Sequence, residues 1–440
     1  MLKNKDLFIF LLTHLIVWTV IPSVTNHNLP LDTIEHIAWG SNLDWGFNKH
    51  PPFVGVPLKV FFDLFGNQDW VFYLLSQIFV ISAFYFIYLF SKDLLNNEQD
   101  ALCSVLMLES IFFFNFTTPE FNVNIAQLPF WALIIFLSYR YFQNEKDIKY
   151  LAAIGVCAAI GMLTKYLFVF LLIGLAIYFL IKIKQSGFKI KYFFPIFIFI
   201  ILITPHFLWL IENSFATFTY ALKRAGQDKS LLDHLINPLV FLFKQIGILS
   251  LFIILSFYLF KKIDLKFSFK DKNFIFLFCL IIVPIIFLFL TSLLLGSKIR
   301  TMWMTPFYLG LGTFLIYIVK NKIIFSHAYK ISFTLIFFSS MAYAAVSIIN
   351  EEKRTDYKGK EVAKNIQGRW DNWILNNQLS KNKIISIHGD EWFAGNLIYN
   401  LKDKPKWFDE RHDKFGKNKK YIRICNDESK CLKIDYKYLQ

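Results

Sequence analysis

Stretches of about twenty consecutive apolar residues recur along the whole chain, and this is the length at which one helix crosses the hydrocarbon core of a bilayer. In lipid such a segment must satisfy its backbone hydrogen bonds internally, so most of the chain can only fold as a bundle of membrane-spanning helices. Apolar residues make up 55% of the 440 residues, and the mean hydropathy is +0.44. These values exclude an ordinary soluble enzyme.

The apolar segments predict about eleven transmembrane helices. The third and the fifth are short for a bilayer, so one of them is a candidate re-entrant segment. The first is followed by no small-residue cleavage site, and we expect it to be retained rather than removed as a signal peptide. In chain order the predicted helices are Leu7–Val24, Trp70–Phe90, Ala101–Phe116, Ile125–Tyr141, Tyr150–Leu163, Tyr166–Ile183, Phe193–Ile211, Pro238–Phe260, Phe274–Leu295, Met302–Val319 and Ile331–Ile349.

The net charge of +15 is explained by topology and does not indicate a nucleic-acid partner. Most lysines lie in short loops between apolar segments, for example Lys182, Lys184, Lys189 and Lys191. If the N-terminus is cytoplasmic, every strongly basic short loop falls on the cytoplasmic side, as the positive-inside rule requires. An odd number of crossings then places the C-terminal tail outside.

Three long polar segments are expected on the outer side: a first loop (Thr25–Asp69), a middle loop (Glu212–Asn237) and a tail from Asn350 to Gln440. The predicted fold is therefore mainly α. A polytopic membrane helix bundle occupies residues 1–349, with the first outer loop at 25–69, and a small α/β extracytoplasmic domain occupies residues 350–440.

The tail has the local patterns of such a small domain. Cys425 and Cys431 flank a turn between its last two strands. On the oxidising side of the membrane this spacing favours a disulfide across a hairpin, and the alternative is two free thiols. The predicted elements are strands at Lys383–His388, Lys420–Ile424 and Leu432–Tyr436 and a helix at Trp392–Leu401.

The first outer loop opens with a cluster of ionisable side chains. If Asp32 to Trp39 is helical, Asp32, Glu35 and His36 share one face. Carboxylates placed directly after a first transmembrane helix can bind a metal, orient a polar acceptor or act as a base. The alternative is the solvated face of a helix lying on the membrane surface, and the residues alone leave both open. The apolar residues of this helix are expected to face the membrane: Ile34, Ile37 and Ala38.

Several basic residues lie on the outer side, against the charge rule. Cations near the lipid interface are costly unless they are paired or functional, and the phosphate of a lipid carrier is a suitable partner. The alternative is side chains that snorkel from helix ends. These residues are Lys49, Lys165, Lys223, Arg224, Lys298 and Arg300.

Two further candidates lie between and within later helices. Glu120, accompanied by Asn122 and Asn124, either completes the acidic site or caps the fourth helix. His206 lies inside the seventh helix near its outer end, where it is either functional or part of a core hydrogen bond.

Taken in order, these pieces resemble the family 39-like glycosyltransferases of the GT-C class, relatives of the protein O-mannosyltransferases and of the bacterial lipid A aminoarabinose transferase. No single piece is specific, whereas their order and spacing over nearly the whole chain are. The matching pieces are Leu31-Asp32…Glu35…Ala38-Trp39-Gly40, Lys49-His50-Pro51-Pro52, Asn122-Val-Asn124, Leu128-Pro-Phe-Trp131, Leu163-Thr-Lys165-Tyr166, Pro205-His206-Phe-Leu-Trp209 with Arg224, Met302-Trp303-Met-Thr-Pro306 and Gly389-Asp390-Glu-Trp392-Phe-Ala-Gly-Asn396.

The resemblance implies an integral-membrane enzyme that takes a sugar from a polyprenyl phosphate. It implies a catalytic role for Asp32, with Glu35 and Glu120 as further acids. Its implied donor-phosphate ligands are Lys165, Arg224, Lys298 and Arg300. Its implied acceptor or substrate contacts are His36, Lys49, His50, Asn122 and His206. A divalent metal ion is a possible cofactor, although Lys49-His50-Pro51 stands where the aminoarabinose enzyme has a Glu-Lys-Pro piece.

The expected function is the transfer of an aminosugar, such as galactosamine or aminoarabinose, to lipid A or another envelope acceptor. The enzyme is expected to be a multi-pass protein of the bacterial inner membrane with its active site facing the periplasm. The alternative is a lipid or sugar-lipid transporter (a flippase), which predicts inverted repeats or charges at the bilayer midplane. The sequence shows no repeat, and its candidate charges gather at the outer helix ends.

Overall fold

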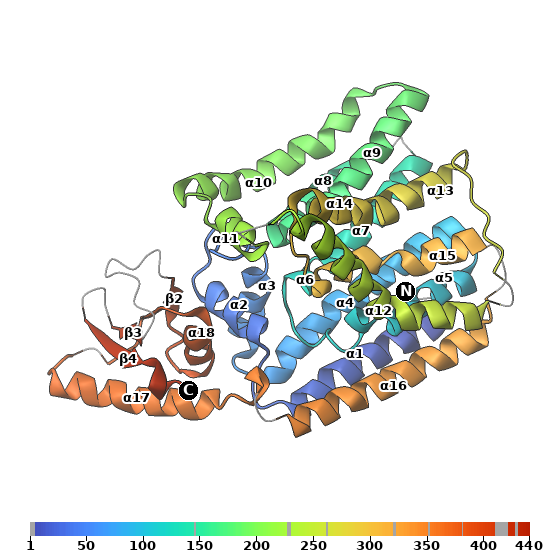
Figure 1. Ribbon diagram of the computed structural model, residues 1–440. Coiled ribbons are helices and arrows are strands. Elements are labelled where there is room, and N and C mark those ends of the chain that lie inside the picture. Colours follow the sequence, from blue (N-terminus) through green and yellow to red (C-terminus); the bar gives the residue numbers. More distant parts are fainter. Residues whose placement is uncertain are drawn as a thin grey trace.

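A computed structural model describes residues 5–144, 147–226, 230–260, 263–319, 323–350, 353–380, 382–409, 421–426 and 430–440. Lys420, the first residue of a predicted strand, lies outside these ranges, as does the tip of the hairpin turn. The described chain forms a membrane helix bundle with a small sheet at one end (Figure 1). In Figure 1 the N-terminal end of the chain lies in the helix bundle, and the C-terminus lies beside α17 in the small domain.

Within the described ranges, eight helical segments are long and apolar enough to cross a membrane, or nine if one bent pair is counted as a span. Several of these segments are interrupted or begin with a 3-10 turn, so a single span can consist of two or three labelled elements. The spans are α1 (Lys5–Thr25), α4 (Asp69–Leu95), α6 (Val123–Ala126) with α7 (Leu128–Gln143), η3 (Tyr166–Phe168) with α9 (Val169–Ser186), η4 (Ile190–Phe193) with α10 (Phe194–Glu212), α12 (Asp233–Leu259), α13 (Lys272–Leu277) with the π-helical turn η5 (Phe278–Ile282) and α14 (Val283–Leu295), and α16 (Phe325–Ile349).

The other three predicted helices are shorter or bent. The fifth is the 17-residue α8 (Ile148–Thr164). The tenth consists of the 3-10 segment η6 (Thr301–Tyr308) and α15 (Leu311–Val319), which meet at 54°. The third contains only the nine-residue α5 (Glu98–Leu106), followed by the 3-10 turns η1 (Met107–Ser110) and η2 (Phe112–Phe114).

Polar side chains accompany the break in the third segment. The Asn115 side chain donates to the backbone oxygen of Glu109 at 2.6 Å, and the Glu109 carboxylate contacts Nδ1 of His14 on α1 at 2.6 Å. A side chain bonded to the backbone offers the chain an alternative to the regular helix ladder. The chain therefore reaches Glu120 through irregular turns instead of a full helix.

Three short helices gather at the end of the bundle next to the C-terminal region: α2 (Leu31–Ser41), α3 (Gly55–Phe65) and α11 (Ala216–Arg224) (Figure 1). A Cβ atom on Gly40 would lie 2.9 Å from the backbone oxygen of Gly55, so only glycine allows α2 and α3 to approach this closely. The predicted surface segment after Pro52 is thus a helix that packs on α2.

The C-terminal region (residues 353–440) contains a four-stranded sheet in the order β2-β1-β3-β4. The strand β1 pairs in parallel with β2 and antiparallel with β3, which pairs antiparallel with β4. A disulfide joins Cys425 and Cys431 across the β3–β4 hairpin. Two elements were not predicted, α17 and β2. The elements are α17 (Gly359–Asn376), β1 (Ser386–His388), α18 (Glu391–Asn400), β2 (Lys406–Phe408), β3 (Tyr421–Cys425) and β4 (Cys431–Asp435).

The helix α18 packs against α2, and this contact joins the C-terminal region to the first outer loop. It corrects the prediction that Ile34, Ile37 and Ala38 face the membrane. These side chains are at most 2% exposed, because the C-terminal region and α3 cover them. The apolar face of an amphipathic helix is the same whether lipid or protein covers it, so the sequence pattern could not separate the two cases.

Candidate functional site

Asp32 lies in the first turn of α2, soon after α1 ends. Its backbone N–H donates to Oε1 of Glu120 at 3.0 Å, so two acids 88 residues apart in the chain meet at the start of this helix. The positive end of the helix dipole favours a carboxylate at this position. Burial raises the pKa of Glu120 to about 8, and the neighbouring Asp32 adds to this effect.

Asp32 also lies within the electrostatic reach of a group of cations. Burial raises the pKa of its carboxyl, and the cations oppose this effect. The candidate acids and cations, drawn from separate parts of the sequence, therefore converge at one place. The cations that act on Asp32 are Lys49, Lys165, Arg224 and Arg300.

Lys49 links the first outer loop to the C-terminal region. Its Nζ donates to Oε2 of Glu35 at 2.9 Å and lies 3.2 Å from Oε2 of Glu391 on α18. Burial opposes the charge on Lys49, but Glu391 and Glu35 together raise its pKa above the ordinary value. Burial, reinforced by Glu391, raises the pKa of Glu35 to about 7. The first loop thus shares an ion cluster with α18.

Lys165 lies in the turn between α8 and η3 and is 5% exposed. Its Nζ donates to Oδ1 of Asn124 and lies 5.3 Å from the ring centre of Trp303. Burial lowers the pKa of Lys165 to about 7, an effect that Asp32 partly opposes. A buried lysine held by a neutral amide, close to Asp32, is suited to an incoming anion.

A cavity of about 750 Å³ lies among α11, α12 and the segment before η6. Four cations line it, namely Arg224, Lys244, Lys298 and Arg300. In the part of the chain that the structure describes, none of the four forms an ion pair with a carboxylate. The remaining wall is mainly apolar and includes Phe112, Phe113, Val240, Phe241, Ile248 and Met302. We call this the cationic cavity.

A second cavity, of about 370 Å³, lies between the start of α2, the turns after η2 and the outer end of α16. Glu120 lines it together with Lys353 and Arg354. The Nζ atom of Lys353 is buried and has no hydrogen-bond partner among the described residues. Phe112 and Thr117 line both cavities, so the two adjoin. We call this the Glu120 cavity.

Two of the predicted substrate contacts are packed inside the protein. The ring of His36 is 4.5 Å from the ring of Trp39, centroid to centroid, and burial lowers the pKa of His36 to about 3, so it stays neutral. The Asn122 side chain accepts from the backbone N–H of Asn124 at 2.9 Å and caps α6. Neither residue lines the cationic cavity or the Glu120 cavity.

The other two histidines of the prediction hold the first loop against the bundle. Nδ1 of His206 is 2.5 Å from the carbonyl oxygen of Trp45, and its Nε2 is 2.7 Å from the hydroxyl of Tyr166. The ring of His50 lies 6.1 Å from that of Trp39. Burial, followed by the nearby lysines, lowers the pKa of His50 well below its ordinary value. These residues fix the loop that carries Lys49.

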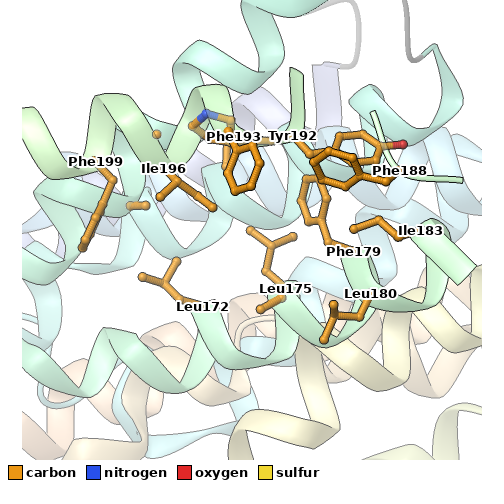
Figure 2. A pocket seen from close by; sticks show the side chains of 15 residues that line it. Leu172, Leu175, Phe179, Leu180, Ile183, Phe188, Tyr192, Phe193, Ile196 and Phe199 are labelled. Carbon is orange, nitrogen blue, oxygen red and sulfur yellow. The ribbon is translucent and has the colours of Figure 1, made fainter. Parts of the chain in front are cut away.

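A third cavity, of about 380 Å³, lies among α8, α9 and α10, and Figure 2 shows its side chains in close-up. Its lining is uncharged and almost entirely aliphatic or aromatic, with Phe179, Tyr192 and Phe199 among the rings. Such a surface can contact lipid chains, but it offers no group for acid–base or phosphate chemistry.

No group of three or more His, Cys, Asp or Glu side chains in the described ranges could hold a metal ion. Around Asp32 the partners of the acids are ammonium groups and backbone N–H groups, as Lys49 shows for Glu35. The donor set present here therefore does not fit the divalent metal that the resemblance allows, and we derive no step through one.

Four residues of the site were not among the predicted ones. Lys244 lies inside a predicted apolar helix, where a lone lysine is a signal of function by default. Glu391 lies within the Gly389–Asn396 piece of the resemblance, but no role was assigned to it. Lys353 and Arg354 were counted as part of a polar tail, because nothing in the sequence places them beside Glu120.

The geometry defines the class of protein first. This is a multi-pass membrane protein in which one group of carboxylates and cations gathers at one end of the helix bundle, next to two cavities with mixed apolar and cationic walls. Such walls suit lipids with anionic head groups.

Comparisons with known proteins give a family match over part of the chain and a shared fold. Residues 49–209 match the family model described as dolichyl-phosphate-mannose-protein mannosyltransferase. The fold is similar to the crystal structure of ArnT from Cupriavidus metallidurans bound to undecaprenyl phosphate, with a TM-score of 0.64 and 12% identity over 92% of this chain and 86% of that one. The apo state of the same ArnT matches with a TM-score of 0.60 and 12% identity, over 91% and 85% of the two chains. No curated protein sequence matches the chain significantly.

The family model matches 161 of the 440 residues, and together with the shared fold it supports the resemblance to the membrane glycosyltransferases of the GT-C class. The predicted fold class is confirmed, and the predicted family and enzyme class are supported by the same two matches.

Proposed function

We propose that this enzyme transfers an aminosugar from a polyprenyl phosphate to lipid A or another envelope acceptor, at the periplasmic face of the bacterial inner membrane. One observation carries the proposal: Asp32 meets Glu120, which lines a basic cavity that adjoins a larger cavity lined by four cations. The undecaprenyl phosphate bound to the structurally similar ArnT supports a donor of this kind.

The cationic cavity is the proposed donor site. When the bond between C1 of the sugar and the phosphate oxygen breaks, its electron pair stays on the phosphate. Arg224, Arg300 and Lys298 would stabilise this growing negative charge, which is usually the largest contribution to catalysis in such sites. Lys165 would act on the same charge from the side of Asp32. The apolar wall of the cavity would contact the start of the polyprenyl chain.

The Glu120 cavity is the proposed acceptor site. Lys353, whose buried Nζ has no hydrogen-bond partner among the described residues, and Arg354 favour an anionic acceptor such as a lipid phosphate. If the acceptor oxygen belongs to a phosphate, it attacks C1 without losing a proton, and the carboxylates only orient it. If the acceptor is a hydroxyl, its proton passes to Asp32 or Glu120 as the new bond to C1 forms.

The sugar is proposed from the charge of its surroundings. Asp32, Glu35, Glu120 and Glu391 bring four carboxyl groups to the neighbourhood of α2, with Lys49 among them. An acidic group of this kind favours a protonated amino group on the donor sugar, which is why galactosamine or aminoarabinose is preferred over a neutral hexose.

The location is proposed from the topology and the cysteines. We assign residues 1–349 to the membrane domain and residues 350–440 to a periplasmic domain. A disulfide between Cys425 and Cys431 is stable in the oxidising periplasm and would be reduced in the cytosol.

The test is mass spectrometry of lipid A and envelope glycans from cells with the gene, without it, and with the Asp32→Asn variant. We expect one sugar modification to be present only with the native gene, and its mass to name both sugar and acceptor. If the modification persists with Asp32→Asn but disappears with the gene, the protein supplies a substrate, as a flippase would, and does not perform the transfer. An unchanged profile in all three strains would refute the proposal.

A further inference from the structure

We propose that Glu391 is a positioning residue, through which the C-terminal region holds Lys49 in place beside the catalytic carboxylate of Asp32. This inference rests on the proposed function, because it assigns Lys49 and Asp32 to the transfer site. The C-terminal region would then contribute to catalysis, in addition to packing over α2.

Glu391 is fixed by its own helix and is largely withdrawn from water. It is the first residue of α18, and the preceding Asp390 caps that helix by accepting from the backbone N–H groups of Trp392 and Phe393. Glu391 is 8% exposed, and its Oε2 lies 3.2 Å from Nζ of Lys49. Its Oε1 is buried and has no hydrogen-bond partner in the part of the chain that the structure describes. A buried carboxylate in this state depends on its ammonium partner.

The position of Lys49 depends on two carboxylates on opposite sides of it. Glu35 comes from α2, the helix that carries Asp32, whereas Glu391 comes from a segment more than 300 residues later. Lys49 comes first among the cations that act on Asp32. Without the charge of Glu391, Lys49 would keep only the partner on α2 and would be free to turn toward Asp32. A direct pair between them would neutralise the carboxylate that the reaction uses.

Attachment of the C-terminal region to α2 does not require Glu391. A Cβ atom on Gly395 would lie 2.4 Å from the backbone oxygen of Ile34, so the two helices are in direct backbone contact. The backbone N–H of Trp407 donates to Oγ of Ser41 at 2.9 Å. Asn28 and Asn396 form another link, at 2.9 Å. The contribution of Glu391 is therefore electrostatic, and it can be removed while the two parts stay together.

The experiment compares Glu391→Gln with the native protein and with Glu361→Gln as a matched control. Gln keeps the size of the side chain and removes its charge. Glu361 lies on α17 of the same region, its side chain is 75% exposed, and its nearest cation is Lys358 at 3.9 Å. Two readouts are used in purified protein: transfer kinetics, and the reactivity of the Lys49 amine toward an amine-specific reagent, followed by mass spectrometry of the peptide.

We expect Glu391→Gln to lower kcat by about tenfold or more, because small displacements of a catalytic group have effects of this size. The donor KM and the melting temperature should stay unchanged, and Glu391→Asp should recover part of kcat. The Lys49 amine should become more reactive in Glu391→Gln. In a Lys49→Met background, Glu391→Gln should have no further effect on kcat.

The inference is overturned if Lys49 is equally reactive in Glu391→Gln and in the native protein. It is also overturned if kcat is unchanged, or if the melting temperature falls together with kcat and Glu391→Asp restores neither. The reactivity readout needs no turnover. If the native protein transfers no sugar, the proposed function fails, while the labelling still decides whether Glu391 positions Lys49.

Discussion

Asp32 and Glu120 are surrounded differently, and the surroundings assign them different roles. Four cations act on Asp32, whereas the largest effects on Glu120 are burial and the nearness of Asp32 itself. Glu120 also lines the cavity that holds Lys353 and Arg354. We therefore place Asp32 between donor phosphate and acceptor, and Glu120 on the acceptor side, where it also fixes the start of α2.

Replacing Asp32 tests this assignment directly. We expect Asp32→Asn to lower sugar transfer by about 10²-fold or more, since a positioned carboxylate contributes this much as base or orienting group. The rate is measured in proteoliposomes with the donor identified from the envelope analysis. Asp63→Asn is the matched control, because Asp63 is half-exposed on α3 and pairs only with Lys59 in the described structure. Equal loss in both variants would point to misfolding instead of catalysis.

The pH dependence of transfer separates the carboxylates from Lys165. The carboxylates act when ionised, so kcat/KM should rise as pH increases toward the pKa of Glu120, about 8. Lys165 acts when protonated, so its contribution should fall as pH rises through its pKa of about 7. We expect a narrow bell-shaped profile and, in Lys165→Arg, a descending limb moved to higher pH because arginine stays charged. A profile that is the same in Lys165→Arg would remove Lys165 from the donor site.

At the scale of single residues, the sequence singled out most of the charged residues that the structure brings together. Separate motifs and the charge rule pointed to Asp32, Lys49, Lys165 and Arg224, and the structure places the three cations within electrostatic reach of Asp32. Lys353 was not predicted, because no local sequence pattern places it in the wall of the Glu120 cavity.

The helices show where sequence patterns stop being informative. The length of the apolar segments predicts α1, α4 and α16 well, because a long apolar segment in lipid can satisfy its backbone hydrogen bonds only as a helix. It overestimates the third segment, which is broken after α5 where the Asn115 side chain contacts the backbone of Glu109. The three-residue β2 gives no periodicity to detect, since its pairing with β1 is set by the fold around it.

The hairpin of the C-terminal region gives a prediction at this scale. Replacing both Cys425 and Cys431 by serine should lower the stability of the region by about 2 kcal/mol, the entropy effect expected for a small closed loop. The measurement is the melting temperature of the full-length double variant, compared with the native protein under reducing and oxidising conditions. The prediction fails if reduction lowers the native melting temperature and the double variant's by the same amount.

For the whole molecule, the account requires that the site and the C-terminal region lie on one side of the membrane and the lysine-rich loops on the other. The first requirement is met within the chain, because α18 packs on α2. The positive-inside rule predicts on which face of the membrane the site and the C-terminal region lie, because the charge of the loops sets the orientation of a membrane protein.

Labelling from outside intact cells tests this orientation. Single cysteines are placed at exposed positions near the two ends of the bundle, Asp63→Cys on α3 and Lys184→Cys at the end of α9. The native thiols give a low background, because Cys103, Cys157 and Cys279 are buried. We expect a membrane-impermeant maleimide to label position 63 directly and position 184 only after permeabilisation. The reverse pattern would place Asp32 in the cytoplasm and refute the proposed location.

Binding of undecaprenyl phosphate by the purified protein tests the central claim most directly, because every donor of the proposed kind leaves this carrier behind whatever its sugar. We expect the native protein and Asp32→Asn to bind it far more tightly than undecaprenol. The double variant Arg224→Gln/Arg300→Gln should lose this preference, and Lys223→Gln, which changes a neighbouring cation that does not line the cavity, should keep it. Equal binding of the phosphate and the alcohol by the native protein, or an undiminished preference in the double variant, would contradict the account.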